Sequence, residues 1–199
     1  NSPQLLLAQA QVAARFKNFT QAEAAARRLL KAAWLPTPPL FRQGRMTLAK
    51  ILIDAGRCES AEDVLSAASQ ADPGLARDAG YLQLRLAQAE GLARSKKFAA
   101  AETAAKRLLE SAAGTAQPLV RQGRMLLARV LLDQGKDEAA SALLSSGLEQ
   151  DPRWSEAALL RSEIMLRKGQ LLLGQGDLRL AEAAAGPLRA WAKGNFEAT

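Results

Sequence analysis

The sequence predicts an all-α fold, a right-handed α-solenoid of about five antiparallel helical hairpins, and three observations support this prediction. Residues 42–73 return 79 positions later as residues 121–152, with 16 of 32 positions identical. Residues 8–30 return at the same offset as residues 87–109, with 14 of 23 positions identical. Hydrophobic residues make up 48% of the chain and aromatic residues only 5%, a mixture dominated by Ala and Leu that favours closely packed helices. The predicted unit is therefore a 79-residue pair of hairpins.

The first hairpin is predicted from apolar spacing and a capping motif. Apolar residues recur at helical spacing over residues 2–17. Thr20 is a good N-cap, and Glu23 three residues later completes a capping box, so a second helix is expected over residues 20–33. The prolines of the WLPTPPL stretch that follows cannot continue this helix.

Turn residues divide the rest of the chain into further hairpins. Gly56 is expected to separate two helices, and Asp72 and Pro73 to end the second of them. A single long helix over residues 75–95 is expected to open the third hairpin. The ten expected helices span residues 2–17, 20–33, 40–54, 60–70, 75–95, 98–112, 119–134, 137–149, 153–174 and 178–192. They form hairpins in one repeat domain, residues 1–199, with approximate bounds 3–36, 39–73, 74–116, 117–152 and 153–193.

The composition excludes several kinds of chemistry. The chain has no His, the commonest general base and metal ligand, and one Cys, so neither a disulfide nor a thiolate metal cluster can form within it. We therefore expect no catalytic residue, no metal site and no cofactor. Cys58 is expected to be an exposed thiol in the turn between two helices.

The charge distribution leaves the partner open. Lys and Arg number 27 against 20 Asp and Glu, and the first 60 residues hold nine of the former and three of the latter. This excess could attract an acidic protein, an anionic membrane or nucleic acid, but a solvated helix face explains it more simply, and nucleic acid is not expected as a direct ligand. No apolar run approaches the ~18 residues that span a bilayer. A cytoplasmic location is expected, with the periplasm as an alternative because the chain begins at Asn1 and is expected to be a fragment or processed product.

Small and large apolar residues alternate in residues 42–73 in a pattern that resembles the tetratricopeptide repeat. Small residues on each helix let the two helix axes approach, and large ones fill the groove between them. The spacing of about 40 residues exceeds the family's usual value of about 34 and resembles that of bacterial members with long repeats. Where the motif usually has Trp, this chain has Arg45 and Arg124. The matching residues are Leu48, Ala49, Leu52, Gly56, Ala61, Leu65, Ala68 and Pro73 in the first copy, and Leu127, Ala128, Leu131, Gly135, Ala140, Leu144, Gly147 and Pro152 in the second.

The resemblance implies a concave groove, lined by the first helix of each hairpin, that binds an extended peptide or a partner helix. The groove positions carry long polar side chains, mostly donors, which suit carboxylates and backbone carbonyls. A stripe of solvated residues without a ligand is the alternative reading. The expected groove residues are Gln11, Arg15, Gln43, Lys50, Asp54, Gln83, Glu90, Arg94, Gln122, Arg129, Asp133, Arg167 and Gln170.

Two functions are compatible with this prediction. The main hypothesis is a non-enzymatic scaffold or adaptor that binds another protein or peptide in the groove. The alternative is an effector- or protein-binding sensor region of a larger bacterial transcriptional regulator, because repeat length and strings such as LARVLLDQG resemble the maltose-activator family. Neither hypothesis names the partner or the oligomeric state.

Other charged clusters are expected to be structural. Glu62 and Asp63 are predicted to offset the dipole at a helix start, a reading favoured over acid–base catalysis. Basic pairs on second helices are predicted to be solvated, although such pairs can also contact phosphate. These pairs are Arg27-Arg28 and Lys106-Arg107.

Overall fold

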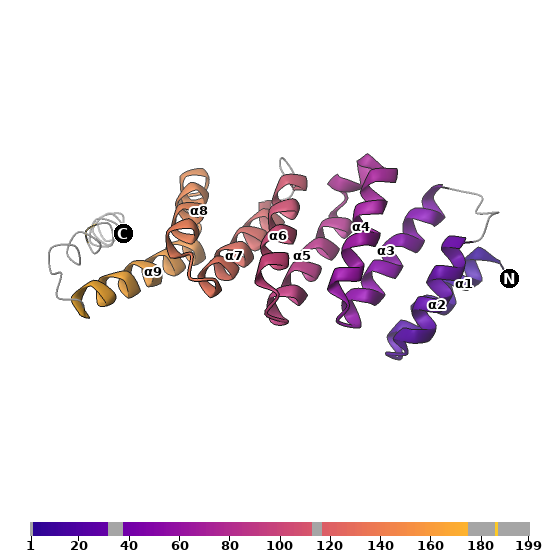
Figure 1. Cartoon of the computed structure of the whole chain (residues 1–199). Coiled ribbons are helices and arrows are strands. Elements are labelled where there is room, and N and C mark those ends of the chain that lie inside the picture. Colours follow the sequence, from indigo (N-terminus) through magenta and orange to yellow (C-terminus); the bar gives the residue numbers. More distant parts are fainter. Residues whose placement is uncertain (1, 32–37, 113–116, 175–185, 187–199) are drawn as a thin grey trace. The chain divides into compact units, whose positions relative to one another are not determined.

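The computed structural model describes residues 2–31, 38–112, 117–174 and 186, and these residues form helices and turns without a strand. The all-α prediction is thereby confirmed (Figure 1). Of the helix expected over residues 178–192, all but residue 186 lies outside the described residues. The helices are α1 (Pro3–Arg15), α2 (Phe19–Lys31), α3 (Pro38–Asp54), α4 (Cys58–Ala71), the 3₁₀ helix η1 (Pro73–Arg77), α5 (Ala79–Arg94), α6 (Phe98–Ser111), α7 (Gln117–Asp133), α8 (Asp137–Gln150) and α9 (Ser155–Gly174).

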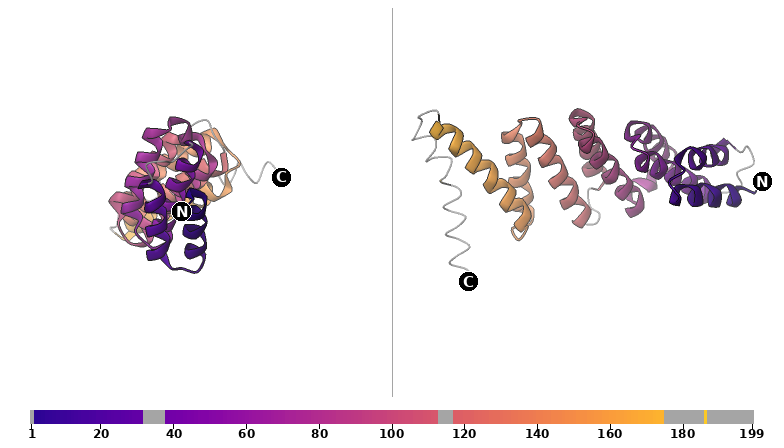
Figure 2. Two further views of the ribbon diagram at one scale, coloured as in Figure 1. Left: turned by 90° about the vertical axis from the view of Figure 1, so that its right-hand side faces the viewer. Right: turned by 90° about the horizontal axis from the view of Figure 1, so that it is seen from below.

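The chain divides into two compact units, residues 1–130 and residues 131–199. In the first unit α1 pairs with α2, α3 with α4, and α5 with α6. Figure 2 shows these neighbouring helices from two further directions. In the second unit α8 packs against α9. Trp154, the residue that precedes α9 in the chain, is buried.

The first helices of the hairpins form a layer of their own in the first unit. Besides its pairing with α2, α1 contacts α3, and α3 in turn contacts α5. The second helices α2, α4 and α6 lie in front of this layer in Figure 1. Residues exposed on α1, α3 and α5 therefore belong to adjacent helices of one layer.

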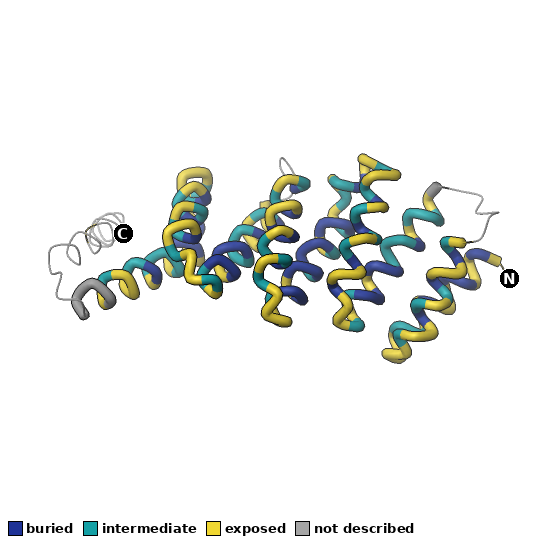
Figure 3. The backbone as a smooth tube through the Cα atoms, viewed as in Figure 1, coloured by how far each residue is buried: buried dark blue, intermediate teal, exposed yellow. Residues whose placement is uncertain are grey.

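Small residues lie where the helices approach most closely, as the sequence predicts. Ala49 on α3 and Ala61 on α4 are both fully buried, and the large residues Leu52 and Leu65 are buried beside them. Figure 3 shows each helix of the first unit with one buried side and one exposed side. All the predicted core positions of residues 42–73 and of their copy are confirmed as buried: Leu48, Ala49, Leu52, Ala61, Leu65, Ala68, Leu127, Ala128, Leu131, Ala140, Leu144 and Gly147.

The turns within hairpins have the same backbone conformation at positions 79 residues apart. Gly56 and Gly135 have φ values of 75° and 72°. Lys17 and Lys96 both have φ of 57°, a left-handed conformation uncommon for residues with a side chain. The predicted turn at Gly56 is thus confirmed, since glycine takes this conformation without a steric penalty.

The predicted N-cap of the second helix is wrong. The helix α2 begins at Phe19, because Asn18 Oδ1 accepts a hydrogen bond from the Gln21 amide at 3.2 Å. Thr20 is therefore inside the helix, and the predicted partner of its capping box, Glu23, binds Arg57 instead. A local side-chain acceptor one residue before the helix replaced the predicted capping box.

The long helix predicted over residues 75–95 is also wrong, because the segment divides at Asp78. The Asp78 side chain accepts from the Tyr81 amide at 3.0 Å and so caps the start of α5. Asp72 caps η1 in the same way by accepting from the Gly74 amide at 3.1 Å. Two consecutive Asp caps therefore produce a short 3₁₀ helix and then an α-helix.

Cys58 is buried, which corrects its prediction as an exposed turn residue. It is the first residue of α4, which begins two positions before the predicted start, and only 4% of Cys58 is exposed. Its Sγ fills the space that a side chain on Gly91 of α5 would occupy. Burial raises the pKa of the Cys58 thiol, although the positive charges of Arg94 and Lys97 oppose this effect.

Candidate functional site

Every residue predicted to line the groove is exposed, and all of them lie on the first helices α1, α3, α5, α7 and α9. Asp133, Arg167 and Gln170 belong to the second unit. The members in the first unit form what we call the polar stripe: Gln11, Arg15, Gln43, Lys50, Asp54, Gln83, Glu90, Arg94, Gln122 and Arg129. Exposure is what a binding surface requires, and the predicted role in binding stays a prediction.

One cation of the polar stripe is paired within its own helix. Lys50 Nζ lies 3.1 Å from Asp54 Oδ2, and both side chains are largely exposed. Arg15, Arg94 and Arg129 have no hydrogen bond or ion pair among the described residues. Separate carboxylates along an extended ligand would thus meet guanidinium groups that no described residue pairs, and one ammonium group shared with Asp54.

A small hollow lies at the start of α3, beside one end of the polar stripe. Gln43 lines it together with Pro39 and Met46. Arg42 also lines it, and its Nη2 is held 2.8 Å from Asp78 Oδ2. Because this ion pair links α3 to the cap of α5, Arg42 positions the neighbouring hairpin and is not free for a ligand.

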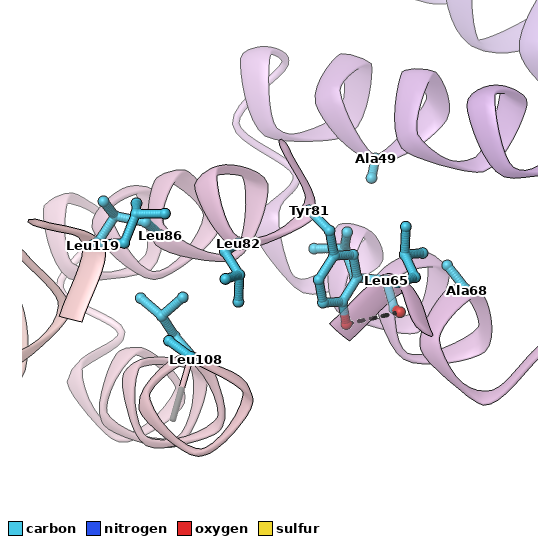
Figure 4. Packing of buried hydrophobic residues seen from close by; sticks show 10 residues of the cluster. Ala49, Leu65, Ala68, Tyr81, Leu82, Leu86, Leu108 and Leu119 are labelled. Carbon is cyan, nitrogen blue, oxygen red and sulfur yellow. Dashed lines mark hydrogen bonds between the residues drawn. The ribbon is translucent and has the colours of Figure 1, made fainter. Parts of the chain in front are cut away.

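The structure contains a buried polar network that the sequence analysis missed. Arg85 of α5 is only 4% exposed, and its Nη1 lies 2.6 Å from Glu62 Oε2 of α4. Arg85 Nε also donates to the Tyr81 hydroxyl at 2.9 Å. That hydroxyl donates to the Leu65 carbonyl at 3.2 Å (Figure 4). Gln88, which is fully buried, donates to Glu62 Oε2 at 2.8 Å. The network joins the second hairpin to the third.

Glu62 is the centre of this network, which corrects its prediction as a helix-dipole residue. Its Oε1 accepts from the Ser66 hydroxyl at 2.7 Å and also binds Arg107 of α6. Burial by itself disfavours the charged carboxylate, but the hydrogen bonds from Ser66, Arg85 and Gln88 and the charge of Arg85 outweigh it and lower the pKa of Glu62 to about 2. Glu62 is therefore ionised throughout the physiological range and acts as the counter-ion of a buried cation.

The basic pairs on second helices are exposed, as the sequence predicts, but three of their four residues also form ion pairs. Arg107 binds Glu62, and Lys106 Nζ lies 2.6 Å from Glu102. Arg27 Nε lies 2.8 Å from Glu23. A hydrogen bond from Arg57 is the main reason that the pKa of Glu23 is lowered. Of these pairs, only Arg28 has no bonding partner among the described residues.

A sequence signal for the network existed. Arg85 interrupts an apolar stretch of α5 between Leu84 and Leu86, at a position where the first hairpin has Leu6. A charged residue at a core position of a helix requires a partner of opposite charge. Glu62 was a candidate for this partner. The sequence alone could not identify it, because the direction of its side chain depends on the packing of α4 on α5.

The sequence profile of the tetratricopeptide repeat matches residues 7–76 and 86–153, more than half of the chain. The chain belongs to the tetratricopeptide repeat family. These repeats generally serve protein–protein interaction and are generally non-catalytic. No curated protein matches the chain in sequence.

Solved tetratricopeptide structures share the fold. The MamA protein aligns with a TM-score of 0.56 and 15% identity, covering 92% of this chain and 87% of that one. A putative kinesin light chain from Podospora anserina with nearly identical TPR-like repeats gives 0.55 and 16%, covering 96% and 95%. BtubC from P. vanneervenii gives 0.52 and 21%, covering 93% and 78%. At these identities the likeness concerns the fold, and the hypothesis of a transcriptional sensor region stays a prediction.

Within the described ranges, His, Cys, Asp and Glu do not gather into a group that could hold a metal ion. In the same ranges, each helix is too short or too polar to cross a membrane.

Proposed function

We propose that the chain is a non-enzymatic scaffold that binds an extended acidic peptide or a partner helix along the polar stripe. The observation that carries this proposal is the exposure of the whole stripe on the first helices of the first unit, where α1 contacts α3 and α3 contacts α5 in a single layer. A ligand lying across this layer would meet side chains from successive hairpins.

The chemistry of the stripe favours acidic ligands. Arg15, Arg94 and Arg129 offer planar guanidinium groups, which bind carboxylates through two parallel hydrogen bonds. Gln11, Gln43, Gln83 and Gln122 offer amide donors and acceptors for the ligand's backbone. Lys50 exchanges its intrahelical partner for a ligand carboxylate at little cost, since exposed ion pairs contribute only ~0–1 kcal/mol. We place this function in the cytoplasm.

The experiment begins with selection of peptides from a displayed random library on the purified 199-residue chain. An enriched peptide is titrated against the parent and against the triple variant Lys50→Glu, Arg94→Glu, Arg129→Glu. The proposal expects acidic peptides and a loss of affinity of at least about tenfold in the triple variant, because three attractive charges become repulsive. All three residues are exposed, so the fold should survive.

A matched triple variant with the same change of charge distinguishes binding through the stripe from attraction to the overall positive charge of the protein. Lys31, Arg77 and Lys96 are exposed cations of the first unit outside the stripe. Their replacement by Glu should change the affinity less than threefold at physiological salt, where distant charges are screened. Equal losses from both triples, or enrichment of peptides without acidic residues, would refute binding through the stripe.

A further inference from the structure

One face of the α1–α2 hairpin carries an apolar hollow of ≈ 700 Å³, and among the described residues only those of α1, α2 and the turn between them line it. Leu5, Val12 and Phe16 line it, and they are 48%, 53% and 82% exposed. These are three of the five large hydrophobic side chains that the described part of the chain leaves exposed. Apolar side chains gathered in this way mark an interaction surface. None of the polar-stripe residues lines this hollow.

The α5–α6 hairpin is the counterpart of α1–α2 at the offset of 79 residues, and α4 covers the face that corresponds to the hollow. The contacts of α4 therefore show what such a face binds. Gln88 Nε2 of α5 donates to Glu62 Oε2 at 2.8 Å and to the Cys58 carbonyl at 3.2 Å. Arg107 of α6 binds the other carboxylate oxygen of Glu62. Gly91 leaves room for the Cys58 side chain. One carboxylate and one backbone carbonyl of α4 are thus recognised by polar groups from both helices of the hairpin.

The α1–α2 hairpin repeats the two key polar groups at the same offset of 79 residues. Gln9 occupies the position of Gln88, and Arg28 occupies the position of Arg107. Both Gln9 and Arg28 line the hollow. Neither has a hydrogen bond or ion pair with the described residues. The hollow therefore has two of the donors that bind Glu62 in the other hairpin, whereas Leu6 stands in place of the third, Arg85, and α4 has no counterpart there among the described helices.

We propose that this face binds an amphipathic α-helix of a partner protein as α5–α6 binds α4, with a Glu of the incoming helix between Gln9 and Arg28. The differences between the two faces define the helix further. Val12 replaces Gly91, so the residue four positions before that Glu must be Gly or Ala, smaller than the Cys that α4 has there. Phe16 occupies the position of Ser95, which lies beside the start of α4, and so favours an apolar residue at the start of the incoming helix.

A second copy of this chain is a poor occupant. Its α4 is already bound to α5 and α6 through Glu62. Its α8, the counterpart of α4, has Ser141 in place of the Glu and Asp137 in place of Cys58. A charged residue at that second position would face Val12, which offers no polar partner. Neither α4 nor α8 of a second copy therefore supplies the required pattern of a small residue and a Glu four positions later.

The test uses a fluorescent, hydrocarbon-stapled peptide with the sequence of residues 58–71 in which Cys58 is replaced by Ala. Stapling on the solvent side is needed because an isolated helix of this length is marginal in water. Fluorescence anisotropy should show saturable binding to the 199-residue chain. Replacing the peptide's Glu62 by Gln should weaken binding about fivefold, and Arg28→Glu in the protein about tenfold. Combining Arg28→Glu with a peptide carrying Glu62→Lys should restore most of the affinity.

The control Lys31→Glu changes an exposed charge on the same helix outside the hollow, and should alter the affinity less than twofold. Circular dichroism of each variant checks that the helices are retained. Absence of saturable binding, or equal losses from Arg28→Glu and Lys31→Glu, would overturn the proposal. So would a concentration-dependent dimer of the parent that Val12→Asp dissociates, because a second copy would then occupy the face.

Discussion

Replacement of Glu62 by Gln should destabilise the protein by about 3 kcal/mol, because it leaves the Arg85 guanidinium buried without a counter-ion. Only 5% of the Arg85 side chain is exposed, against 24% of Glu62. Removing one partner of a buried ion pair costs ~3–5 kcal/mol. The amide oxygen of Gln still accepts one hydrogen bond, which places the expected loss at the lower end of this range. The midpoint of thermal unfolding should fall by about 6–12 °C, measured by far-UV circular dichroism.

Two companion variants make the result specific. Glu59→Gln removes an acidic residue from the same helix. The side chains of Glu59 and of its partner Lys97 are 64% and 49% exposed, so the loss of stability should stay below ~1 kcal/mol. The double variant Glu62→Ser, Arg85→Leu removes both charges and copies residues found 79 positions away, Ser141 and Leu6. Its stability should recover most of the loss seen in Glu62→Gln. Equal stability of Glu62→Gln and Glu59→Gln would refute the buried ion pair.

The pH dependence of the same variants tests the ionisation of Glu62. Its pKa falls from 4.5 in the unfolded chain to about 2 in the fold, so its contribution is complete above pH 4.5 and is lost as the pH falls towards 2. The shift corresponds to roughly 3 kcal/mol, which partial solvent contact reduces to about 2 kcal/mol. The stability difference between parent and Glu62→Gln should therefore narrow by about 2 kcal/mol between pH 4.5 and pH 2. A constant difference would contradict the lowered pKa.

Three further substitutions test the packing and the caps. Gly91→Ala should destabilise by ~1–3 kcal/mol, because its Cβ would overlap Cys58 Sγ, and Cys58→Ala in the same chain should recover most of this loss. Asp78→Ala should cost ~1–2 kcal/mol through loss of the cap on the Tyr81 amide, whereas Asp78→Asn should cost less. Ala61→Leu should cost ~1–3 kcal/mol in thermal unfolding, and a midpoint equal to that of the parent would show that Ala61 is not at a helix crossing.

The helices and their core positions could be predicted because helix packing has a short sequence signature. Ala49 and Ala61 mark the crossings of α3 and α4, and a crossing admits only a small residue. Gly56 marks the turn, where only glycine takes a positive φ freely. Each of these signals comes from residues only a few positions apart in the sequence, and the internal repeat contains each signal twice.

Helix starts and the burial of Cys58 were mispredicted because they depend on side-chain competition. Asn18 and Thr20 are both good caps, and the sequence does not say which one the backbone uses. Cys58 is buried only because α5 has a glycine at Gly91, 33 positions along the chain. Such pairings across hairpins require the packed arrangement of α4 on α5.

The predicted groove residues illustrate a different limit. Exposure of Lys50, Arg94 and Arg129 could be predicted from helical periodicity, since these positions lie outside the apolar stripe of their helices. The ion pair between Lys50 and Asp54 follows from their spacing of four residues and could also have been foreseen. Which ligand the stripe binds depends on the partner's surface, about which one chain carries no information.

The polar network distinguishes the junction of α4 with α5 from other helix junctions, which the repeated apolar core alone does not do. Residues 8–30 and 87–109 are identical at 14 of 23 positions, so the apolar surface of α4 alone distinguishes poorly between α1–α2 and α5–α6. Arg85 is present on α5, whereas the equivalent Leu6 offers Glu62 no charge. A buried ion pair adds little net stability over an apolar pair, but it penalises every arrangement that separates the two charges. The network therefore selects the correct neighbour for α4 and leaves the Gln9 and Arg28 face of the first hairpin free for another helix.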